Sequence, residues 1–322
     1  MKRLVAEWER QTCIAFILPH EQTDWNAYLD EILDSYYSLI SLISKYQKVL
    51  IITQNKTLAK SLTKLPNVQI ITASYNDTWA RDTLPISVEN NGKIEMLNFT
   101  FNAWGGKYDG SLDNALSQTL FPKAKKIDYI LEGGAIDSNG AGLLLLHKDS
   151  FTHNRNAEDF ETIQKQLKAI FASSLLIVQN GYHLGDDTDS HIDTLARFVN
   201  KKTIFYSQSS NKKNETHASL QAMECELKEL AKNHNLELIA IPNPAQQYYQ
   251  NRPIISTYLN FIIINDAVIV PIFDDVNDEQ TLRIFRQYFP LHDVIGFSSN
   301  VFSRQNGSLH CACMNFYNTV II

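Results

Sequence analysis

The sequence predicts a single α/β domain built from one repeated unit, a strand–helix–strand segment with an added hairpin. Two observations carry this prediction. Apolar runs of strand length recur between amphipathic helical stretches, and short polar turns join several pairs of these runs. The unit recurs about five times at intervals of about 50–70 residues. Because such units bury their apolar faces against their neighbours, we expect them to pack around a common axis as one domain spanning residues 1–322.

The first elements follow a β-α-β pattern. Residues 24–46 have apolar side chains at three- and four-residue spacing, which predicts an amphipathic helix. Residues 48–53 and 68–72 are apolar runs of strand length, and a short helix is expected between them near 57–65.

The rest of the chain contains pairs of strands joined by turns. Asn-Gly between two apolar runs is a strong hairpin signal, and it occurs at residues 91–92 and 139–140. The five expected hairpins span residues 81–101, 130–147, 192–207, 258–273 and 309–322. Helices are expected near 155–171, 214–234 and 277–289, followed by strands at 175–178, 236–241 and 293–297.

Composition limits the classes of function. Of the 322 residues, 44% are hydrophobic and 20% are charged, which is typical of a soluble globular protein. The net charge is -6 and no long basic run occurs, which argues against nucleic acid or membrane as the main partner and is compatible with a cationic small substrate. No export signal or membrane-span pattern is found, so we expect a cytoplasmic protein with reduced thiols. The sequence is also compatible with a homodimer.

The first residues of the five hairpins carry the polar groups that suggest chemistry. Strand beginnings in a radial repeat meet near the axis, so we expect one pocket holding carboxylates, a histidine, an asparagine and a thiol. We expect His191 and Asp193 to lie at the start of a buried strand and to face the same side, because residues two apart in a strand do so. The segments are Trp79-Ala-Arg-Asp82, Glu132-Gly-Gly134, His191-Ile-Asp193, Tyr258-Leu-Asn260 and His310-Cys311.

A thiol with a histidine and an orienting carboxylate is an arrangement for nucleophilic catalysis. Cys311 is the expected nucleophile, because the thiolate is the reactive form of cysteine. His191 is the expected general acid and base, and Glu132 would orient its ring. His310 would project to the opposite face of a strand and ranks below His191, while Cys313 is interpreted as a core residue.

Two further carboxylates, Asp82 and Asp193, are not needed for acyl transfer. They suit a planar cation with N–H donors, such as a guanidinium, because carboxylates accept such donors in charge-assisted pairs. In this hypothesis Cys311 attacks the guanidinium carbon, and His191 protonates the departing nitrogen so that ammonia leaves. Water then hydrolyses the amidino-thioether, and no metal or organic cofactor is required.

Structural and functional alternatives exist for these residues. Asp82 could form a surface ion pair with Arg81. Glu132 could be a turn residue, and Cys311 could be a small core residue, the commoner fate of a free cysteine. A metal-dependent hydrolase is another reading, because loop acids and histidine can bind divalent ions. Its ligands would be Asp186, Asp187, Asp189, His191 and Asp193.

Several motifs occur together along the chain: Trp79-x-Arg-Asp82, Phe101-Asn-Ala-Trp-Gly-Gly-Lys-Tyr108, Glu132-Gly-Gly134, His191-Ile-Asp-x-Leu-Ala-Arg-Phe198, Ser256-x-Tyr-x-Asn-Phe261 and Leu309-His-Cys311. Together they resemble the agmatine deiminases and the related bacterial peptidylarginine deiminases. The likeness covers essentially the whole chain. It implies the pentein fold, a five-fold pseudosymmetric β/α propeller of ββαβ-type repeats, in agreement with the repeat count.

The resemblance also implies roles for individual residues. Cys311 is the nucleophile, His191 the acid and base with Glu132 as its partner, and Asp82 and Asp193 grip the guanidinium. Other expected substrate-binding residues are Trp79, whose ring suits a cation, Asn260 and Trp104. The implied reaction converts agmatine to N-carbamoylputrescine and ammonia through an amidino-cysteine intermediate, a step of putrescine and polyamine biosynthesis.

The chain departs from the usual family pattern at the pocket rim. The segment Gln305-Asn-Gly-Ser-Leu-His-Cys311 lacks a glycine run, Met314-Asn315 replaces a common Gln-Gln, and Ser190 replaces glycine. The sequence therefore does not determine which group the substrate carries beyond the guanidinium. Peptidyl-arginine and free arginine are alternatives to agmatine. Candidates for contacting the tail are Trp104 and Asp189 for an amine and Arg252 and Arg304 for a carboxylate. A non-catalytic binding protein of the same fold is the alternative from another class.

Overall fold

The computed structural model describes residues 2–209, 211–212 and 215–317. Within these ranges five sheets share one pattern, and a two-stranded ribbon of β14 (Gln247–Tyr249) and β15 (Arg252–Ile254) is added. In each of the five sheets an antiparallel pair of strands is extended by a parallel strand. A helix connects the two parallel strands, which confirms the expected repeat unit.

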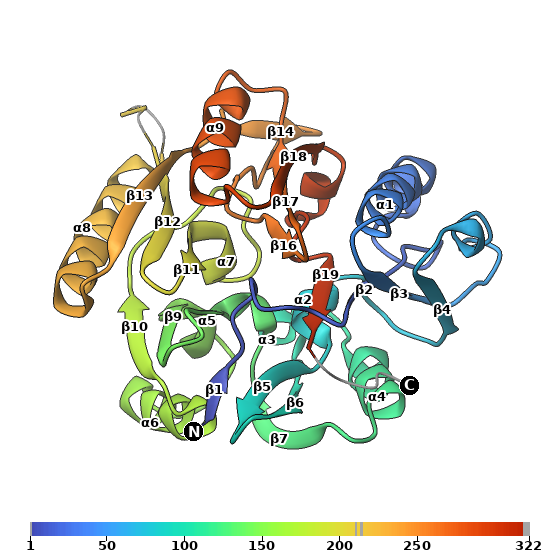
Figure 1. Cartoon of the computed structure of the whole chain (residues 1–322), viewed down its shortest axis with the longest axis horizontal. Helices are drawn as coiled ribbons and strands as arrows, with labels where there is room; N and C mark the ends of the chain where they lie inside the picture. Colours follow the sequence, from blue (N-terminus) through green and yellow to red (C-terminus); the bar gives the residue numbers. More distant parts are fainter. Residues whose placement is uncertain (1, 210, 213–214, 318–322) are drawn as a thin grey trace.

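The sheets follow the order of the sequence around the molecule (Figure 1). Four of them, within the described ranges, are β5 (Ile86–Asn90), β6 (Lys93–Thr100) and β7 (Lys125–Ile130); β8 (Ile136–Ser138), β9 (Leu143–His147) and β10 (Ser174–Val178); β11 (Ala196–Asn200), β12 (Thr203–Gln208) and β13 (Glu237–Pro242); and β16 (Ile262–Ile264), β17 (Ala267–Ile272) and β18 (Asp293–Ser298). Their connecting helices are α4 (Ser111–Leu120), α6 (Phe160–Phe171), α8 (His217–His234) and α9 (Asp278–Tyr288).

The two ends of the chain complete the remaining sheet. Its strands are β19 (Cys313–Phe316), β2 (Cys13–Ile17), β3 (Lys48–Thr53) and β4 (Val68–Thr72), and α1 (Leu29–Ile43) connects β2 to β3. Figure 1 shows β19, in red, beside β2, in blue, and their pairing is antiparallel. A further N-terminal strand, β1 (Lys2–Leu4), pairs with β5. The strand expected for residues 319–322 lies outside the described residues.

The hairpins begin later than the sequence predicted. Single helical turns, α2 (Ala80–Thr83), η3 (Gly133–Ala135) and α7 (Ile192–Leu195), precede β5, β8 and β11. The prediction that His191 and Asp193 lie in a strand is therefore wrong. Three or four residues are too few to show a helical period, so the apolar pattern could not reveal these turns.

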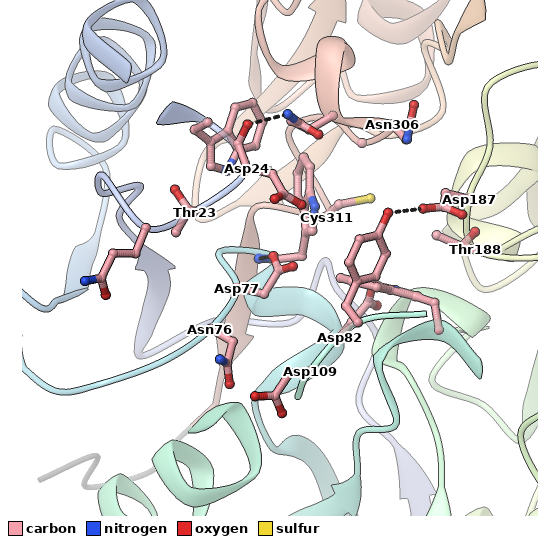
Figure 2. A pocket seen from close by; sticks show the side chains of 17 residues that line it. Thr23, Asp24, Asn76, Asp77, Asp82, Asp109, Asp187, Thr188, Asn306 and Cys311 are labelled. Carbon is pink, nitrogen blue, oxygen red and sulfur yellow. Dashed lines mark hydrogen bonds between the residues drawn. The ribbon is translucent and has the colours of Figure 1, made fainter. Parts of the chain in front are cut away.

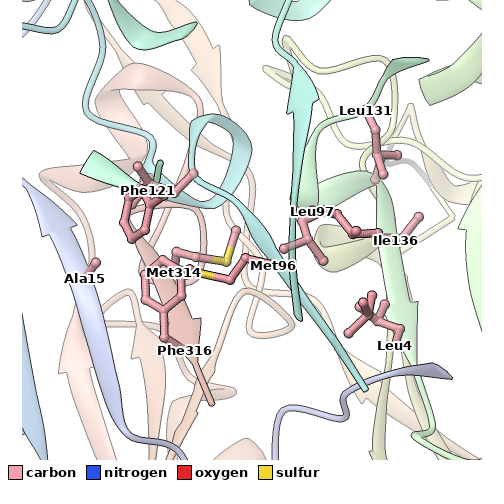
Figure 3. Packing of buried hydrophobic residues seen from close by; sticks show 14 of the residues in the cluster. Leu4, Ala15, Met96, Leu97, Phe121, Leu131, Ile136, Met314 and Phe316 are labelled. Atoms are coloured by element: carbon pink, nitrogen blue, oxygen red, sulfur yellow. The ribbon is translucent and has the colours of Figure 1, made fainter. Parts of the chain in front are cut away.

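Apolar side chains between the sheets and their covering helices form the core. Figure 3 shows one cluster in which Phe121, Met314 and Phe316 lie close together. The rings of Phe121 and Phe316 are stacked with their centroids 5.2 Å apart. Burying each large apolar side chain contributes about 1.5–3 kcal/mol. No helix in the described part of the chain is long and apolar enough to cross a membrane.

Candidate active site

A pocket with an acidic lining opens beside Cys311. Of the residues that the structure describes, none with a basic side chain lines it, whereas five carboxylates do: Asp24, Asp77, Asp82, Asp109 and Asp187. Aromatic rings of Trp25, Trp79, Trp104 and Tyr108 form much of the rest. Cys311 is only 6% exposed, and Figure 2 shows these acids distributed around it. The lining therefore favours a cationic ligand.

The thiol of Cys311 is held by two neighbouring side chains. Asn260 Nδ2 donates to the sulfur at 3.2 Å, and Asp193 Oδ2 lies 3.7 Å from it. Asn260 Oδ1 also accepts the backbone N–H groups of Cys311 and His310, so a single amide fixes both backbone and sulfur. Burial, together with the negative charges of Asp193 and Asp82, raises the pKa of the Cys311 thiol well above its usual value. The thiol is therefore protonated in the free protein.

His191 is fully buried, and one ring nitrogen fixes its orientation. Its Nε2 lies 3.0 Å from Glu132 Oε2, whereas Nδ1 is 3.7 Å from Asp82 Oδ1. Burial alone would lower the pKa of His191, but the carboxylates of Asp82 and Glu132 outweigh it and raise the pKa to about 9. The ring is therefore a cation at neutral pH.

Glu132 has a second partner, Arg155, which no sequence motif indicated. Arg155 Nη2 and Nε donate to Glu132 Oε2 at 3.0 and 3.2 Å. Arg155 also pairs with Asp189, which does not line the pocket, so the structure does not support Asp189 as an acceptor for a substrate amine. Arg155 lies in a loop without a recognisable motif, and no local pattern in the sequence indicates its contact with Glu132.

Hydrogen bonds to both carboxylate oxygens fix the Asp82 side chain. Asp82 does not form the alternative ion pair with Arg81. Its Oδ1 accepts the backbone N–H of Gly134, and its Oδ2 accepts Trp104 Nε1–H, each at 3.0 Å. Arg81 instead donates from Nη2 to Asn315 Oδ1 at 2.6 Å. Trp104 has a φ of 53°, which is unfavourable for a bulky residue. The bond to Asp82 therefore holds a strained backbone in place.

Asp193 contacts the nucleophile segment through one oxygen. Its Oδ2 accepts from Asn260 Nδ2 at 3.2 Å and lies 2.7 Å from His310 Nδ1. Burial would raise the pKa of Asp193, but the hydrogen bond and charge of His310 outweigh it and lower the pKa. Asp193 is therefore ionised beside the thiol.

Gly134 marks the point where these groups converge. A Cβ atom at this glycine would lie 2.6 Å from His191 Nδ1, 3.1 Å from Asp82 Oδ1 and 3.2 Å from Asp193 Oδ2. The structure thus brings together five residues that the sequence placed in one pocket: Asp82, Glu132, His191, Asp193 and Cys311. Of the other expected binding residues, Trp79 and Trp104 line the pocket and Asn260 contacts the thiol.

Unpaired polar atoms lie in the same place. Glu132 Oε1, His191 Nδ1 and Asp193 Oδ1 are buried and have no hydrogen-bond partner in the described part of the chain. Buried polar atoms are nearly always paired, and leaving one unpaired costs about 1–3 kcal/mol. Such atoms gathered beside a thiol indicate a site built for a ligand with hydrogen-bonding groups.

The acids proposed for a metal site have separate partners. Asp186 accepts the backbone N–H groups of Thr188 and Ser190, which fixes the loop before His191. Asp187 lies 3.2 Å from Lys107 Nζ and accepts the Tyr108 hydroxyl at 2.9 Å. Within residues 2–209, 211–212 and 215–317, no group of three or more His, Cys, Asp or Glu side chains is arranged to hold a metal ion. These carboxylates shape the loop.

Comparison with known proteins identifies the family. A model of the Porphyromonas-type peptidyl-arginine deiminase family matches residues 3–316. The chain belongs to this family. The resemblance seen in the sequence motifs is thereby confirmed.

Several of the proteins similar to this chain are named agmatine deiminases. The chain is 25% identical, over 345 residues, to the agmatine deiminase of Pseudomonas syringae pv. syringae (strain B728a), covering 95% of this chain and 93% of that protein. The C. jejuni agmatine deiminase, solved as a cysteine-to-serine variant with substrate bound, is 40% identical with a TM-score of 0.95, covering 99% and 97% of the two chains. The agmatine deiminase of Enterococcus faecalis, 22% identical with a TM-score of 0.88 over 98% and 95%, shows the shared fold alone.

Proposed function

We propose that this protein is an agmatine deiminase, which hydrolyses agmatine to N-carbamoylputrescine and ammonia in putrescine biosynthesis. The observation that carries the proposal is the buried Cys311 thiol beside Asp193, at a pocket whose described lining has five carboxylates and no basic side chain. Agmatine is positively charged at both ends, so both ends find carboxylates there. The agmatine deiminases among its relatives support the same substrate.

In this proposal the guanidinium binds between Asp82 and Asp193. The unpaired Asp193 Oδ1 accepts one N–H group, and Asp82 accepts another. The ring of Trp79, which lines the pocket beside Cys311, packs against the cation. These contacts place the central guanidinium carbon next to the sulfur, which is the geometry that nucleophilic attack requires.

The protons then move between Cys311, His191 and the substrate. The bound cation lowers the pKa of the thiol, which loses its proton to solvent, and the thiolate bonds to the guanidinium carbon. The His191 imidazolium protonates the departing amino group from Nδ1, so the C–N bond breaks and ammonia leaves. Neutral His191 next takes a proton from water, and the resulting hydroxide attacks the amidino-thioether. The C–S bond then breaks and releases the ureido product, while Glu132 keeps the ring oriented throughout.

Free arginine suits this pocket less well. Its α-carboxylate would meet Asp24, Asp77 and Asp187 without a described basic side chain in the lining. Arg304, a candidate from the sequence, lies over the rings of Tyr28 and Tyr249 and pairs with Glu31 at 3.0 Å. Neither Arg304 nor Arg252 lines the pocket.

The proposal extends to the architecture and the location of the protein. The shared strand pattern and the pairing of β19 with β2 support a pentein propeller of five ββαβ repeats that forms a single domain. A cytoplasmic location, as expected from the sequence, would match a free metabolite as the substrate.

A ureido-product assay with agmatine, free arginine and an arginine-containing peptide tests this function. We expect kcat/KM for agmatine to exceed the other two values by about a hundredfold or more, because each lost or repelled charge costs about 1–3 kcal/mol. Cys311→Ser should abolish turnover with an unchanged Tm. Cys313→Ser is the matched control and should keep turnover, because its buried thiol contacts His310 O and not the pocket. Turnover by Cys311→Ser would exclude the mechanism, a preference for the peptide would exclude agmatine as the main substrate, and no turnover of any compound would support a binding protein.

A further inference from the structure

A line of three ionisable side chains extends from the pocket to the N-terminal segment. His310 Nδ1 lies 2.7 Å from Asp193 Oδ2, and His310 Nε2 lies 2.8 Å from Glu7 Oε2. His310 is 3% exposed and stands directly before Cys311. Figure 1 shows the N-terminal segment after β1 running across the middle of the molecule. Glu7 belongs to this segment and reaches His310 from it. The roles assigned to Cys311 and His191 do not use this line.

The partners of the two ring nitrogens of His310 restrict where hydrogens can lie on the ring. An ionised carboxylate can only accept hydrogen bonds, so each of the two contacts needs a hydrogen on the imidazole. Glu7 is surrounded by donors: Arg197 Nη2 contacts its Oε2, and the N–H of Ile263 donates to its Oε1 at 2.9 Å. Asp193 accepts from Asn260 as well. These donors favour ionised carboxylates, and two ionised carboxylates require a hydrogen on each ring nitrogen of His310.

We propose that His310, held as an imidazolium between Glu7 and Asp193, is a positioning residue that keeps Asp193 ionised and directed at the substrate. This inference rests on the proposed function, because it concerns the grip on the guanidinium. The imidazolium occupies Asp193 Oδ2 and leaves Oδ1, which is buried and unpaired in the described part of the chain, for the substrate. Glu7 supplies the second negative charge that stabilises a buried imidazolium.

Other charged side chains surround Glu7 and His310. Arg197 contacts Glu7, and its Nε lies 3.7 Å from Asp137 Oδ1. Arg81 Nε donates to the backbone oxygen of His310 at 3.4 Å. Glu7, Arg81, Asp137 and His310 also line one small cavity on this side of the nucleophile segment. Neutralising Glu7 therefore leaves Arg197 and Arg81 facing the imidazolium, and His310 loses its stabilising partner.

Steady-state kinetics of the full-length protein with agmatine test the proposal. Glu7→Gln and His310→Asn should each raise KM about tenfold, because one charged partner of the guanidinium grip is weakened. The acid limb of the kcat/KM profile should also move up by about one pH unit, since the pKa of Asp193 rises when its cationic neighbour is lost. KM should rise more in His310→Leu than in His310→Asn, because the amide of the introduced asparagine can still donate a hydrogen bond to Asp193.

Glu9→Gln is the matched control for Glu7→Gln. Glu9 lies two residues away in the same segment and is also paired with an arginine, Arg3, with a contact of 2.8 Å. It contacts neither His310 nor Asp193, so its KM should stay within about twofold of the wild type and its acid limb should not move. A purely structural role of Glu7 would reduce the number of active sites or the Tm and leave KM and the acid limb unchanged. That result would overturn the proposal.

A second measurement needs no substrate. With 15N-labelled histidine, the ring of His310 should show the imidazolium pattern at pH 7 in the free wild-type protein, and the signal is assigned by its loss in His310→Asn. His183 provides an internal comparison, because burial lowers its pKa and it should be neutral. A neutral His310 ring would overturn the inference even if agmatine is turned over. If the wild type does not hydrolyse agmatine, the proposed function fails, and this spectrum still decides the state of His310.

Discussion

Arg155 Nη2 lies 3.0 Å from Glu132 Oε2, and the two side chains are 1% and 0% exposed. Glu132 uses the same oxygen to contact His191 Nε2, so the arginine and the histidine share one carboxylate atom. A buried carboxylate needs a paired charge, and Arg155 is the cation that stays charged at every working pH. Arg155 thus supports the orientation of His191 without lining the pocket.

Arg155→Gln should therefore destabilise the protein and reduce turnover. Removing one member of a buried ion pair leaves the other charge unpaired, which costs about 3–5 kcal/mol. The control is Arg286→Gln, because Arg286 forms an exposed pair with Glu279 at the same distance of 3.0 Å. Pairs of that kind contribute about 0–1 kcal/mol. Urea unfolding of both variants measures the difference, and equal losses of stability would contradict this account of the Arg155–Glu132 pair.

Alkaline pH should both inactivate and destabilise the protein through His191. The pKa of His191 is raised to about 9 in the folded state, against 6.5 for an unperturbed histidine. A raised histidine pKa contributes stability that is complete below pH 6.5 and is lost as the pH rises through about 9. The contribution at neutral pH is about 3 kcal/mol at most.

The His191→Gln variant tests that contribution. Its free energy of unfolding should depend less on pH between 6.5 and 9 than that of the wild type. The wild-type kcat should fall above pH 9, because neutral His191 has no proton to give to the departing nitrogen. An unfolding curve with the same pH dependence in both proteins would refute the assignment of this charge to His191.

The sequence predicted which residues form the site better than it predicted the backbone conformation around them. Asp82, Glu132, His191, Asp193 and Cys311 could be placed together because each stands at the start of a repeat unit, and such starts converge. The turns α2 and α7 were missed because each has only four residues.

Residues that do not stand at the start of a repeat unit could not be predicted as part of the site. Arg155 reaches Glu132 across 23 positions, and Glu7 reaches His310 across 303. No periodic pattern encodes such contacts, which depend on the three-dimensional path of the chain. His310 was ranked below His191 as the base because it would project to the opposite face of a strand from Cys311. That reason is wrong, because His310 and Cys311 stand in a turn before β19 and both contact Asp193.

Gly134→Ala should disable the site with little loss of stability elsewhere. The added Cβ would lie 2.6 Å from His191 Nδ1, closer than any real contact of this kind, so the ring must move. The displacement should lower kcat about a hundredfold, because small misplacements of a catalytic group have effects of that size. Gly296→Ala is the control, since its Cβ meets only apolar side-chain atoms, the nearest 3.1 Å away on Ile272. A variant at Gly134 with normal kcat would show that the ring can adapt.

Asp77→Asn should weaken substrate binding and stabilise the fold. Burial, and then repulsion from Asp113, raises the pKa of Asp77 to about 7 from 3.8. The folded state therefore resists ionising Asp77, and the wild type loses stability relative to the variant as the pH rises from 3.8 to about 7. The amide oxygen of the introduced asparagine can still accept the backbone N–H groups of Thr78 and Trp79, which Asp77 Oδ1 accepts in the wild type. The free energy of unfolding of Asp77→Asn should exceed that of the wild type at about pH 8 and not at about pH 4.

Asp109→Asn serves as the control for Asp77→Asn, because the pKa of Asp109 is shifted in the opposite direction. Asp109 also lines the pocket, but it is exposed, and a hydrogen bond from the backbone N–H of Ser111 lowers its pKa. Its ionised form is therefore favoured in the folded state, so its loss should not stabilise the protein at about pH 8. The KM for agmatine should rise in Asp77→Asn, because the pocket loses a carboxylate. If both variants gained equal stability at that pH, the effect would come from the net charge of the protein and not from the burial of Asp77 beside Asp113.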